Sequence, residues 1–203
     1  MDSLICLFVH LALLSTSFGS QETQQCPLDT PCVILVGNNI RNGNIQQRYW
    51  SHACTCGDGV RCPVEWGEDP EKTVRLYLHT NNAVRAIVIE MKFCYQVQSR
   101  AMCSPNQVAV SLKGYSVLPH QLKNINCRCP GNAPLHVQKV WFERFMERHQ
   151  NFVCSIPTCE VNQRVSCSHL GQYETTYICE CPESFRCVIS PSSTQGFCEP
   201  ISS

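Results

Sequence analysis

The cysteines of this chain constrain its fold more than any other feature. The 203 residues contain 17 cysteines, and one of them, Cys6, lies in an apolar N-terminal stretch. Removing that stretch leaves 16, an even number. A C-x-C step then occurs three times, at Cys54–Cys56, Cys127–Cys129 and Cys179–Cys181. An even count at this density is typical of an exported protein whose cysteines are joined in disulfides.

The N-terminal stretch has the pattern of a secretory signal. Leu4 to Leu14 form an apolar run that only His10 interrupts, which suits a signal sequence and is too short to span a bilayer. Cleavage after Gly19 places small residues at the positions that a signal peptidase reads. We therefore predict a signal peptide over 1–19, secretion of the mature chain, and no membrane insertion.

The charge balance bears on the class of partner. Lys and Arg number 16, and so do Asp and Glu, but the signal segment holds Asp2 and no basic residue. The mature balance is then 16 to 15, a net charge of +1. A nearly neutral chain argues against nucleic acid as the main partner, because binding to phosphates needs a strong basic surplus.

The cysteine spacing indicates a repeat of about 50–70 residues. Both complete copies end in C-x-C-x5-C, and the middle copy lacks the last cysteine. The copies are Cys26, Cys32, Cys54, Cys56 and Cys62; then Cys94, Cys103, Cys127 and Cys129; then Cys154, Cys159, Cys167, Cys179, Cys181, Cys187 and Cys198. The totals of five, four and seven require at least one disulfide between copies, and a bridge from the first to the third is the minimum solution. The full connectivity stays open, because sixteen cysteines allow about two million pairings.

The sequence between the cysteines predicts a small, disulfide-rich, mainly β fold. Apolar and branched residues alternate with polar ones, and turn signals separate them: Asn42-Gly43, Asn81-Asn82, Lys113-Gly114 and Gly171. The strands predicted in this way are 33–36, 45–50, 74–78, 84–93, 108–112, 163–167 and 175–178. Each long gap between cysteines then forms a β-hairpin that returns to a C-x-C step.

One stretch without cysteine predicts an α-helix. Pro134 can open it, and Val137, Val140 and Trp141 recur near helical spacing up to Gln150. The predicted organisation is a signal peptide (1–19), a first hairpin module (20–72), a middle module (73–133), a helical connector (134–153) and a third hairpin module (154–203).

Signatures of enzymes and metal sites are weak. The mature chain has only Asp29, Asp58 and Asp69 as aspartates, and it contains neither G-x-S-x-G nor H-E-x-x-H. The C-x-C steps do not have the usual C-x2-C spacing of zinc ligands, and export favours disulfides. We expect no enzyme activity, no cofactor, and no catalytic or metal-binding residues.

The sequence indicates a binding site less specifically than it indicates disulfides. Arg41 flanks the first predicted turn, and Lys113 and Tyr115 flank the second. A basic residue beside an aromatic one at a rigid loop tip suits occlusion of a cation pore or of a receptor cleft, although loop tips are also polar because they are solvated. These three residues are the predicted target contacts.

The layout resembles a known family. The start Cys26-Pro-x4-Cys32-Val-x-Leu-Val-Gly, the 16 mature cysteines and the repeated C-x-C-x5-C are similar to the scoloptoxin-11 family of centipede venom. That resemblance covers Cys26 to Cys198 and implies a venom-gland product; some family members are associated with block of voltage-gated potassium channels. The hairpins with C-x-C steps also resemble Argos (giant-lens), a secreted insect antagonist that grips an epidermal-growth-factor-like ligand.

Three hypotheses of function follow, all for a secreted monomer that binds an extracellular protein. The first is a venom neurotoxin that impairs a voltage-gated ion channel, with a potassium channel favoured. The second is an antagonist of a growth-factor-like ligand or its receptor. The third is a protease inhibitor, in which Arg61, Arg100 or Arg186 would serve as the recognition residue.

Overall fold

The computed structural model of this protein describes most of the chain after its N-terminal segment. The described residues are 24–39, 45–51, 54–79, 86–115, 121–143, 146–161 and 165–201. The predicted signal peptide and the predicted turns at Asn42-Gly43 and Asn81-Asn82 lie outside the described residues.

The described residues are mainly β-strand. The N-terminal strands are β1 (Gln24–Gln25), β2 (Val33–Asn39), β3 (Ile45–Ser51), β4 (Cys54–Thr55), β5 (Thr73–His79) and β6 (Ala86–Lys92). The later strands are β7 (Val108–Gly114), β8 (Gln121–Ile125), β9 (Leu135–Glu143), β10 (Glu147–Val153), β11 (Ser166–Leu170), β12 (Glu174–Tyr177), β13 (Phe185–Ile189) and β14 (Gln195–Pro200). Two single 3-10 turns complete the described structure, at Pro70–Lys72 and Pro130–Asn132. No helix of this part of the chain is long and apolar enough to cross a membrane.

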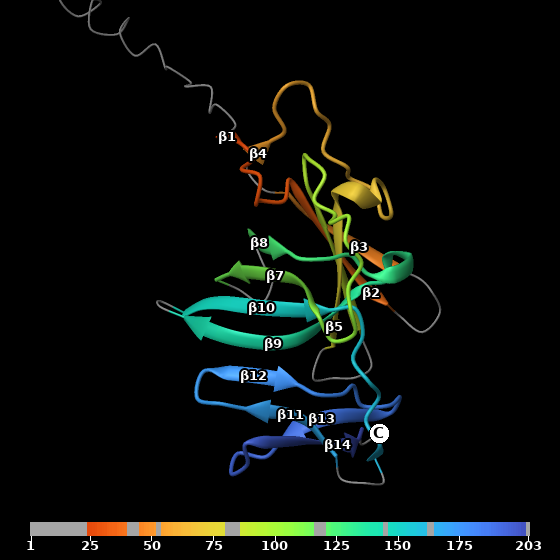
Figure 1. Cartoon of the computed structure of the whole chain (residues 1–203), viewed down its shortest axis with the longest axis vertical. Helices are drawn as coiled ribbons and strands as arrows, with labels where there is room; N and C mark the ends of the chain where they lie inside the picture. The colour runs from red at the N-terminus through yellow and green to blue at the C-terminus, as the bar shows by residue number, and fades with distance from the viewer. Residues whose placement is uncertain are drawn as a thin grey trace, which may run out of the picture.

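Twelve of the strands belong to one hydrogen-bonded sheet. Its main path runs β13-β14-β11-β12-β9-β5-β6-β2-β3, and β10, β7 and β8 continue from the other edge of β9. Strands β1 and β4 pair separately. In Figure 1 strands β5 and β6 stand upright, whereas β7 to β10 and the C-terminal strands lie across the molecule. The path therefore turns sharply where β9 meets β5.

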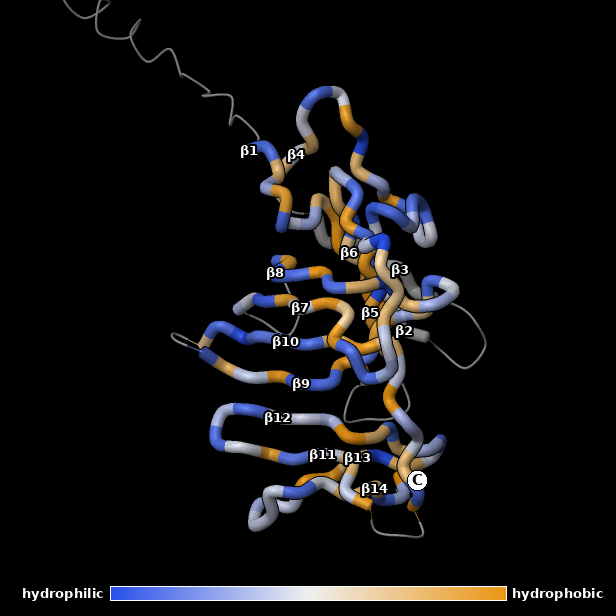
Figure 2. The backbone as a smooth tube through the Cα atoms, in the orientation of Figure 1, coloured by the Kyte–Doolittle hydropathy of each residue, from blue (hydrophilic) through white to orange (hydrophobic). Residues whose placement is uncertain are grey.

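The alternation predicted for the sheet is present. Val74, Leu76 and Leu78 of β5 are buried, and the main core continues to Leu112 of β7 and Phe152 of β10. Figure 2 shows apolar segments along β5 and along the strands that cross it. Alternating apolar side chains point to one face of a strand, so the upright strands share a single core with β7, β9 and β10. The buried residues of the C-terminal strands form a separate cluster around their cysteines.

All sixteen cysteines among the described residues are paired. The eight disulfides are Cys26–Cys54, Cys32–Cys62, Cys56–Cys94, Cys103–Cys127, Cys129–Cys154, Cys159–Cys179, Cys167–Cys187 and Cys181–Cys198. These pairs fall into three consecutive groups with no bridge between them. We call them the first (26–94), second (103–154) and third (159–198) disulfide groups.

The first and third groups have the same connectivity. If the six cysteines of each are numbered in order, the first pairs with the third, the second with the fifth and the fourth with the sixth. The second group has counterparts of the first-to-third pair, Cys103–Cys127, and of the fourth-to-sixth pair, Cys129–Cys154. It has no counterpart of the second-to-fifth pair. In each C-x-C step the first cysteine therefore pairs with a cysteine that precedes the hairpin. The second cysteine pairs with one that lies later in the chain.

The predicted bridge from the first copy to the third is wrong. Cys94 pairs back with Cys56, and Cys154 pairs back with Cys129. The prediction had assigned Cys94 to the second copy and Cys154 to the third. That assignment gave the first and third copies odd numbers of cysteines. The observed groups contain six, four and six cysteines, so each closes within itself.

The predicted helix at 134–150 is also wrong, because this stretch forms strands β9 and β10. Their register passes from Asn151 opposite Lys139 to Phe152 opposite Val137, which leaves Gln138 as an extra residue on β9. This β-bulge puts Val137 and Val140 on the same face of the strand although they are three residues apart. Apolar residues three positions apart normally indicate a helix, so the bulged strand has a sequence pattern that is typical of a helix.

The predicted turn at Lys113-Gly114 is displaced. Both residues lie within β7 and pair with His149 and Arg148 of β10. Strand β7 continues to Gly114, and β8 begins at Gln121. Glycine has a low intrinsic preference for strands, but pairing with β10 holds Gly114 in the ladder.

The three disulfide groups meet at the start of β9. Tyr77 of the first group pairs in register with His136 of the second, and their rings lie 5.4 Å apart. The Nδ1 atom of His136 contacts Glu180 of the third group. Burial, followed by the charge of Glu180, raises the pKa of Tyr77, so its hydroxyl stays neutral at physiological pH. Backbone pairing and side-chain contacts thus join groups that no disulfide joins.

The bulge predicts the outcome of a deletion. Removing Gln138 while keeping β9 paired to β10 would turn Leu135 and Val137 to the opposite face, since one residue reverses the side-chain alternation. Each apolar side chain that leaves the core costs about 1.5–3 kcal/mol. We expect the deletion to lower the free energy of unfolding, measured by urea denaturation, by several kcal/mol.

The variant Gln138→Ala is the matched control, because it keeps the bulge and should unfold at nearly the wild-type urea concentration. A deletion variant as stable as the control would show that the bulge does not set the register.

Candidate binding cleft

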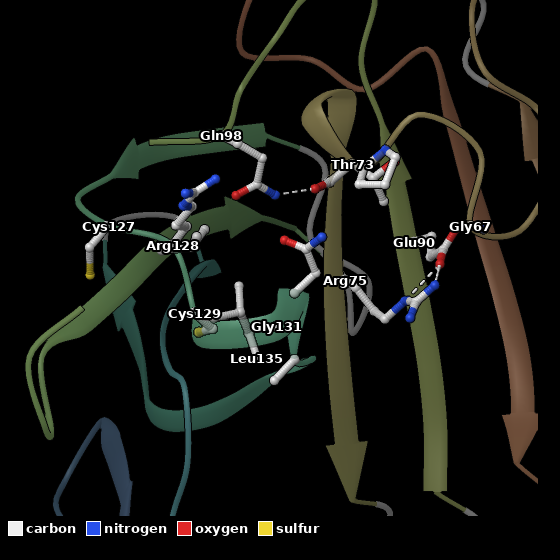
Figure 3. A pocket seen from close by; sticks show the side chains of 14 residues that line it. Gly67, Thr73, Arg75, Glu90, Gln98, Cys127, Arg128, Cys129, Gly131 and Leu135 are labelled. Carbon is white, nitrogen blue, oxygen red and sulfur yellow. Dashed lines mark hydrogen bonds and ion pairs between the residues drawn. The ribbon is translucent and has the colours of Figure 1, made fainter. Parts of the chain in front are cut away.

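A cavity of about 210 Å³ lies where the first and second disulfide groups meet. One wall is the first half of β5, which pairs with β9 only from Leu76 onward. The other wall is the segment from Cys127 to Leu135. Figure 3 shows Arg128 and Gln98 on one side of this cleft and the Arg75–Glu90 pair on the other. The cleft therefore opens at the place where the sheet path turns from β5 to β9.

A buried ionic network supports the β5 wall. Glu90 and Lys92 of β6 are both fully buried, and the Lys92 Nζ lies 2.8 Å from the Glu90 Oε2. The Lys92 ammonium also donates to the backbone carbonyl of Glu68 at 2.7 Å and to the Thr73 hydroxyl at 3.0 Å. These three acceptors match the three N–H groups of the ammonium.

The Glu90 carboxylate likewise has hydrogen-bond donors at both of its oxygens. Its Oε2 accepts a hydrogen bond from the backbone N–H of Gly67 at 3.0 Å, and its Oε1 accepts from the Arg75 Nε at 2.7 Å. A second Arg75 nitrogen contacts the same oxygen. Since Gly67 and Glu68 lie in the loop before β5, the network fastens that loop to the sheet and fixes the Arg75 guanidinium in the cleft wall.

The protonation state of Glu90 follows from these contacts. Burial by itself would raise the pKa of this carboxyl, but hydrogen bonds from Lys92, Gly67 and Arg75 outweigh burial and hold the pKa below its usual value. Glu90 is thus ionised at neutral pH and is already occupied by two cations. It repels an incoming anion less than a free carboxylate would.

Among the described residues, the ionisable groups that line the cleft are Arg75, Arg128 and Glu90. They sum to a net charge of +1. Arg128 lies on the exposed side of the cleft, and its Nε is 3.3 Å from the Met102 sulfur, which is a weak acceptor. Gln98 donates its side-chain amide to the Thr73 carbonyl and closes the upper edge. The cleft therefore offers hydrogen-bond donors and positive charge to an acceptor such as a carboxylate.

Two of the three predicted contact residues lie in the described structure. Lys113 lies on β7 with its ammonium 3.4 Å from Glu147, Tyr115 follows β7 and is 73% exposed, and Arg41 lies outside the described residues. Neither Lys113 nor Tyr115 lines the cleft.

Tyr115 belongs instead to a set of exposed apolar residues at one end of the crossing strands. The set is Tyr115, Phe142, Met146 and Tyr173, of which Met146 is 72% and Tyr173 is 67% exposed. The backbone N–H of Phe142 donates to the Tyr173 carbonyl at 3.0 Å, which brings the second and third disulfide groups together there. Tyrosine, phenylalanine and methionine are enriched at protein interfaces.

Sequence reasoning missed the cleft residues, although two of them carried a signal. Arg128 is the middle residue of the second C-x-C step, so neighbouring disulfides hold its backbone on both sides. Arg75 is a polar residue in an alternating strand, where it was expected only to face away from the core. Nothing in the sequence indicated that Gln98 would bond to Thr73.

Comparisons with known proteins give one distant structural resemblance. No protein family and no curated protein matches the chain, so the likeness to the scoloptoxin-11 family rests on cysteine layout alone. The crystal structure of unliganded Argos is similar over 89% of this chain and 93% of that chain, with 16% identity and a TM-score of 0.40. These values are too low to transfer a residue role or an activity.

The ionic network predicts a pH dependence and a mutational cost. Because the folded-state pKa of Glu90 is lowered, its stabilisation is complete above the usual carboxyl pKa of about 4.3 and is lost as the pH falls through the folded value. Glu90→Gln should remove this part of the acid dependence. At neutral pH it should lower the free energy of unfolding by about 3–5 kcal/mol, since Lys92 stays buried without its carboxylate.

Urea unfolding of wild type and variant at neutral and acid pH checks both effects. The control is Glu174→Gln, which breaks the exposed ion pair with Lys139 and should cost only about 0–1 kcal/mol. Equal costs for the two variants would contradict the role given to the network.

Proposed function

We propose that this protein is a secreted antagonist that binds a growth-factor-like polypeptide and inserts one of that ligand's acidic side chains into the Arg75–Arg128 cleft. The observation that carries the proposal is the cleft itself. It is a small, positively lined cavity, and a buried ionic network and two disulfide groups hold its walls.

The size of the cleft favours a protein ligand. Pockets that enclose a whole drug-sized molecule measure about 300–1,000 Å³. A cavity of about 210 Å³ suits one side chain that projects from a larger surface. Polypeptide ligands also explain the exposed Tyr115 and Tyr173, because aromatic anchors contribute much of the energy of protein interfaces.

The chemistry of the cleft favours an acidic side chain. Arginine binds a carboxylate through parallel hydrogen bonds, and a guanidinium held in place loses less entropy on binding. Arg75 is held by Glu90, and Arg128 adds the surplus charge. The cysteine layout, which resembles that of Argos, makes an epidermal-growth-factor-like ligand the first class to test.

The two other hypotheses have less support. Lys113, the residue predicted to plug a cation pore, is paired with Glu147 and would have to leave that partner to enter a pore. For a protease inhibitor, Arg61 is 73% exposed beside the Cys32–Cys62 bridge, but its guanidinium also lies 3.7 Å from Glu68.

The proposal predicts which variants lose ligand. Arg128→Glu should weaken binding to an epidermal-growth-factor-like ligand by at least about tenfold, because it places like charge against the acidic side chain. Lys123→Glu makes the same charge change on the exposed β8 strand outside the cleft and should bind as wild type does. Surface plasmon resonance with the oxidised mature chain measures both.

Two outcomes would count against the proposal. One is the absence of saturable binding to any epidermal-growth-factor-like ligand. The other is block of a voltage-gated current, recorded by patch clamp, that Lys113→Ala abolishes and Arg128→Glu leaves unchanged; that result would favour the channel hypothesis.

A further inference from the structure

Two carboxylates and a histidine converge where β9 ends and β10 begins. Glu143 ends β9, Glu147 begins β10, and His149 lies two residues further along β10. One potential ligand atom from each lies within 4.8 Å of the others. We propose that these three side chains bind a divalent transition-metal ion of the zinc class, independently of the binding cleft.

His149 is the feature that distinguishes this cluster from ordinary surface acids. Its side chain is only 3% exposed, and among the described residues neither ring nitrogen has a hydrogen-bond partner. The ring stacks on Trp141 with centroids 5.2 Å apart, which fixes its orientation. Its Nε2 points between the two carboxylates and lies 3.3 Å from the Oε2 of Glu143 and 3.3 Å from the Oε2 of Glu147. A buried imidazole nitrogen that makes no hydrogen bond is costly, and an ion bound between the Nε2 and the two carboxylates would satisfy it.

The spacing matches a tetrahedral metal site. Zinc binds histidine nitrogen and carboxylate oxygen at about 2.0–2.2 Å, so two such ligands at a tetrahedral angle lie about 3.3–3.5 Å apart. Both observed distances from the Nε2 of His149 equal 3.3 Å. The third pair of atoms, the two carboxylate oxygens, lies within 4.8 Å, so an ion bound between the three atoms would draw these oxygens to its own coordination distance.

The outer oxygens of both carboxylates are already held by neighbouring donors. The indole N–H of Trp141 donates to the Oε1 of Glu143 at 2.9 Å, and the Lys113 ammonium lies 3.4 Å from the Oε1 of Glu147. The Oε2 atoms are the ones that face His149. Groups that orient the metal ligands in this way are typical of functional metal sites. Lys113, predicted from the sequence as a target contact, would here orient the Glu147 carboxylate.

The three proposed ligands, one imidazole nitrogen and two carboxylate oxygens, favour zinc over calcium and magnesium. Calcium and magnesium prefer six or more oxygen ligands, whereas zinc accepts a mixture of imidazole and carboxylate. The three protein ligands leave a fourth tetrahedral position for water, and Glu143 is half exposed, so an ion can reach the site from solvent. The other close groups of potential ligands in the described residues consist of disulfide-bonded cysteines, which have no thiolate to offer.

Isothermal titration of the oxidised mature chain, first dialysed against a chelator, tests the site with zinc chloride. We expect one zinc ion per chain and no comparable binding of calcium or magnesium. Glu143→Gln, Glu147→Gln and His149→Gln should each weaken zinc binding by at least about tenfold. Cobalt(II) gives an independent readout, since tetrahedral coordination should produce visible absorption bands that zinc then displaces.

The matched controls are Glu174→Gln and His169→Gln, which change the same residue types at exposed positions outside the cluster. Circular dichroism confirms that each variant is folded; Glu143→Gln alters a half-exposed side chain and keeps the test valid if His149→Gln unfolds. The proposal is overturned if the wild-type chain shows no saturable zinc binding, or if the folded site variants bind zinc as tightly as the controls.

Discussion

The structure depends on strand β9, which pairs with other strands along both edges. One edge pairs with β10 over its length, and the other pairs first with β5 and then with β12. Strands β5, β9 and β12 belong to the first, second and third disulfide groups, and no disulfide joins those groups. The sixteen cysteines stabilise each group by restricting its unfolded chain, but backbone hydrogen bonds to β9 set how the groups are arranged.

The proposed function depends on the same arrangement. The cleft exists because β9 leaves one edge of the first half of β5 without a strand beside it, while β6 pairs with the other edge. The fully satisfied Glu90–Lys92 pair holds the loop and the Arg75 side chain beside that gap. A buried ion pair adds little net stability over an apolar core, but its strict geometry can specify one arrangement. In this protein the pair fixes a donor surface before a ligand arrives, which lowers the entropy cost of binding.

Much of the fold could be predicted from sequence because it is encoded locally. The alternation around Val74 and Leu76 identified β5, and the even number of mature cysteines indicated a fold joined by disulfides. The helix prediction failed because the extra residue Gln138 gave a strand the spacing of a helix. The grouping of cysteines failed because spacing alone could not show that Cys94 and Cys154 close the preceding groups. The cleft could not be predicted, since Arg75 and Arg128 line the same cavity only because β5 pairs with β9.

Amide hydrogen exchange, followed by NMR on the oxidised protein without ligand, tests most directly whether β9 holds the three groups together. The account predicts that the β9 amides between Val137 and Trp141 belong to the slowest-exchanging class and exchange with the same free energy as those of β5 and β12. The contradictory result is slow exchange inside each disulfide group together with much faster exchange along β9. That pattern would mean that the disulfides build three independent units and that the cleft between them is not fixed.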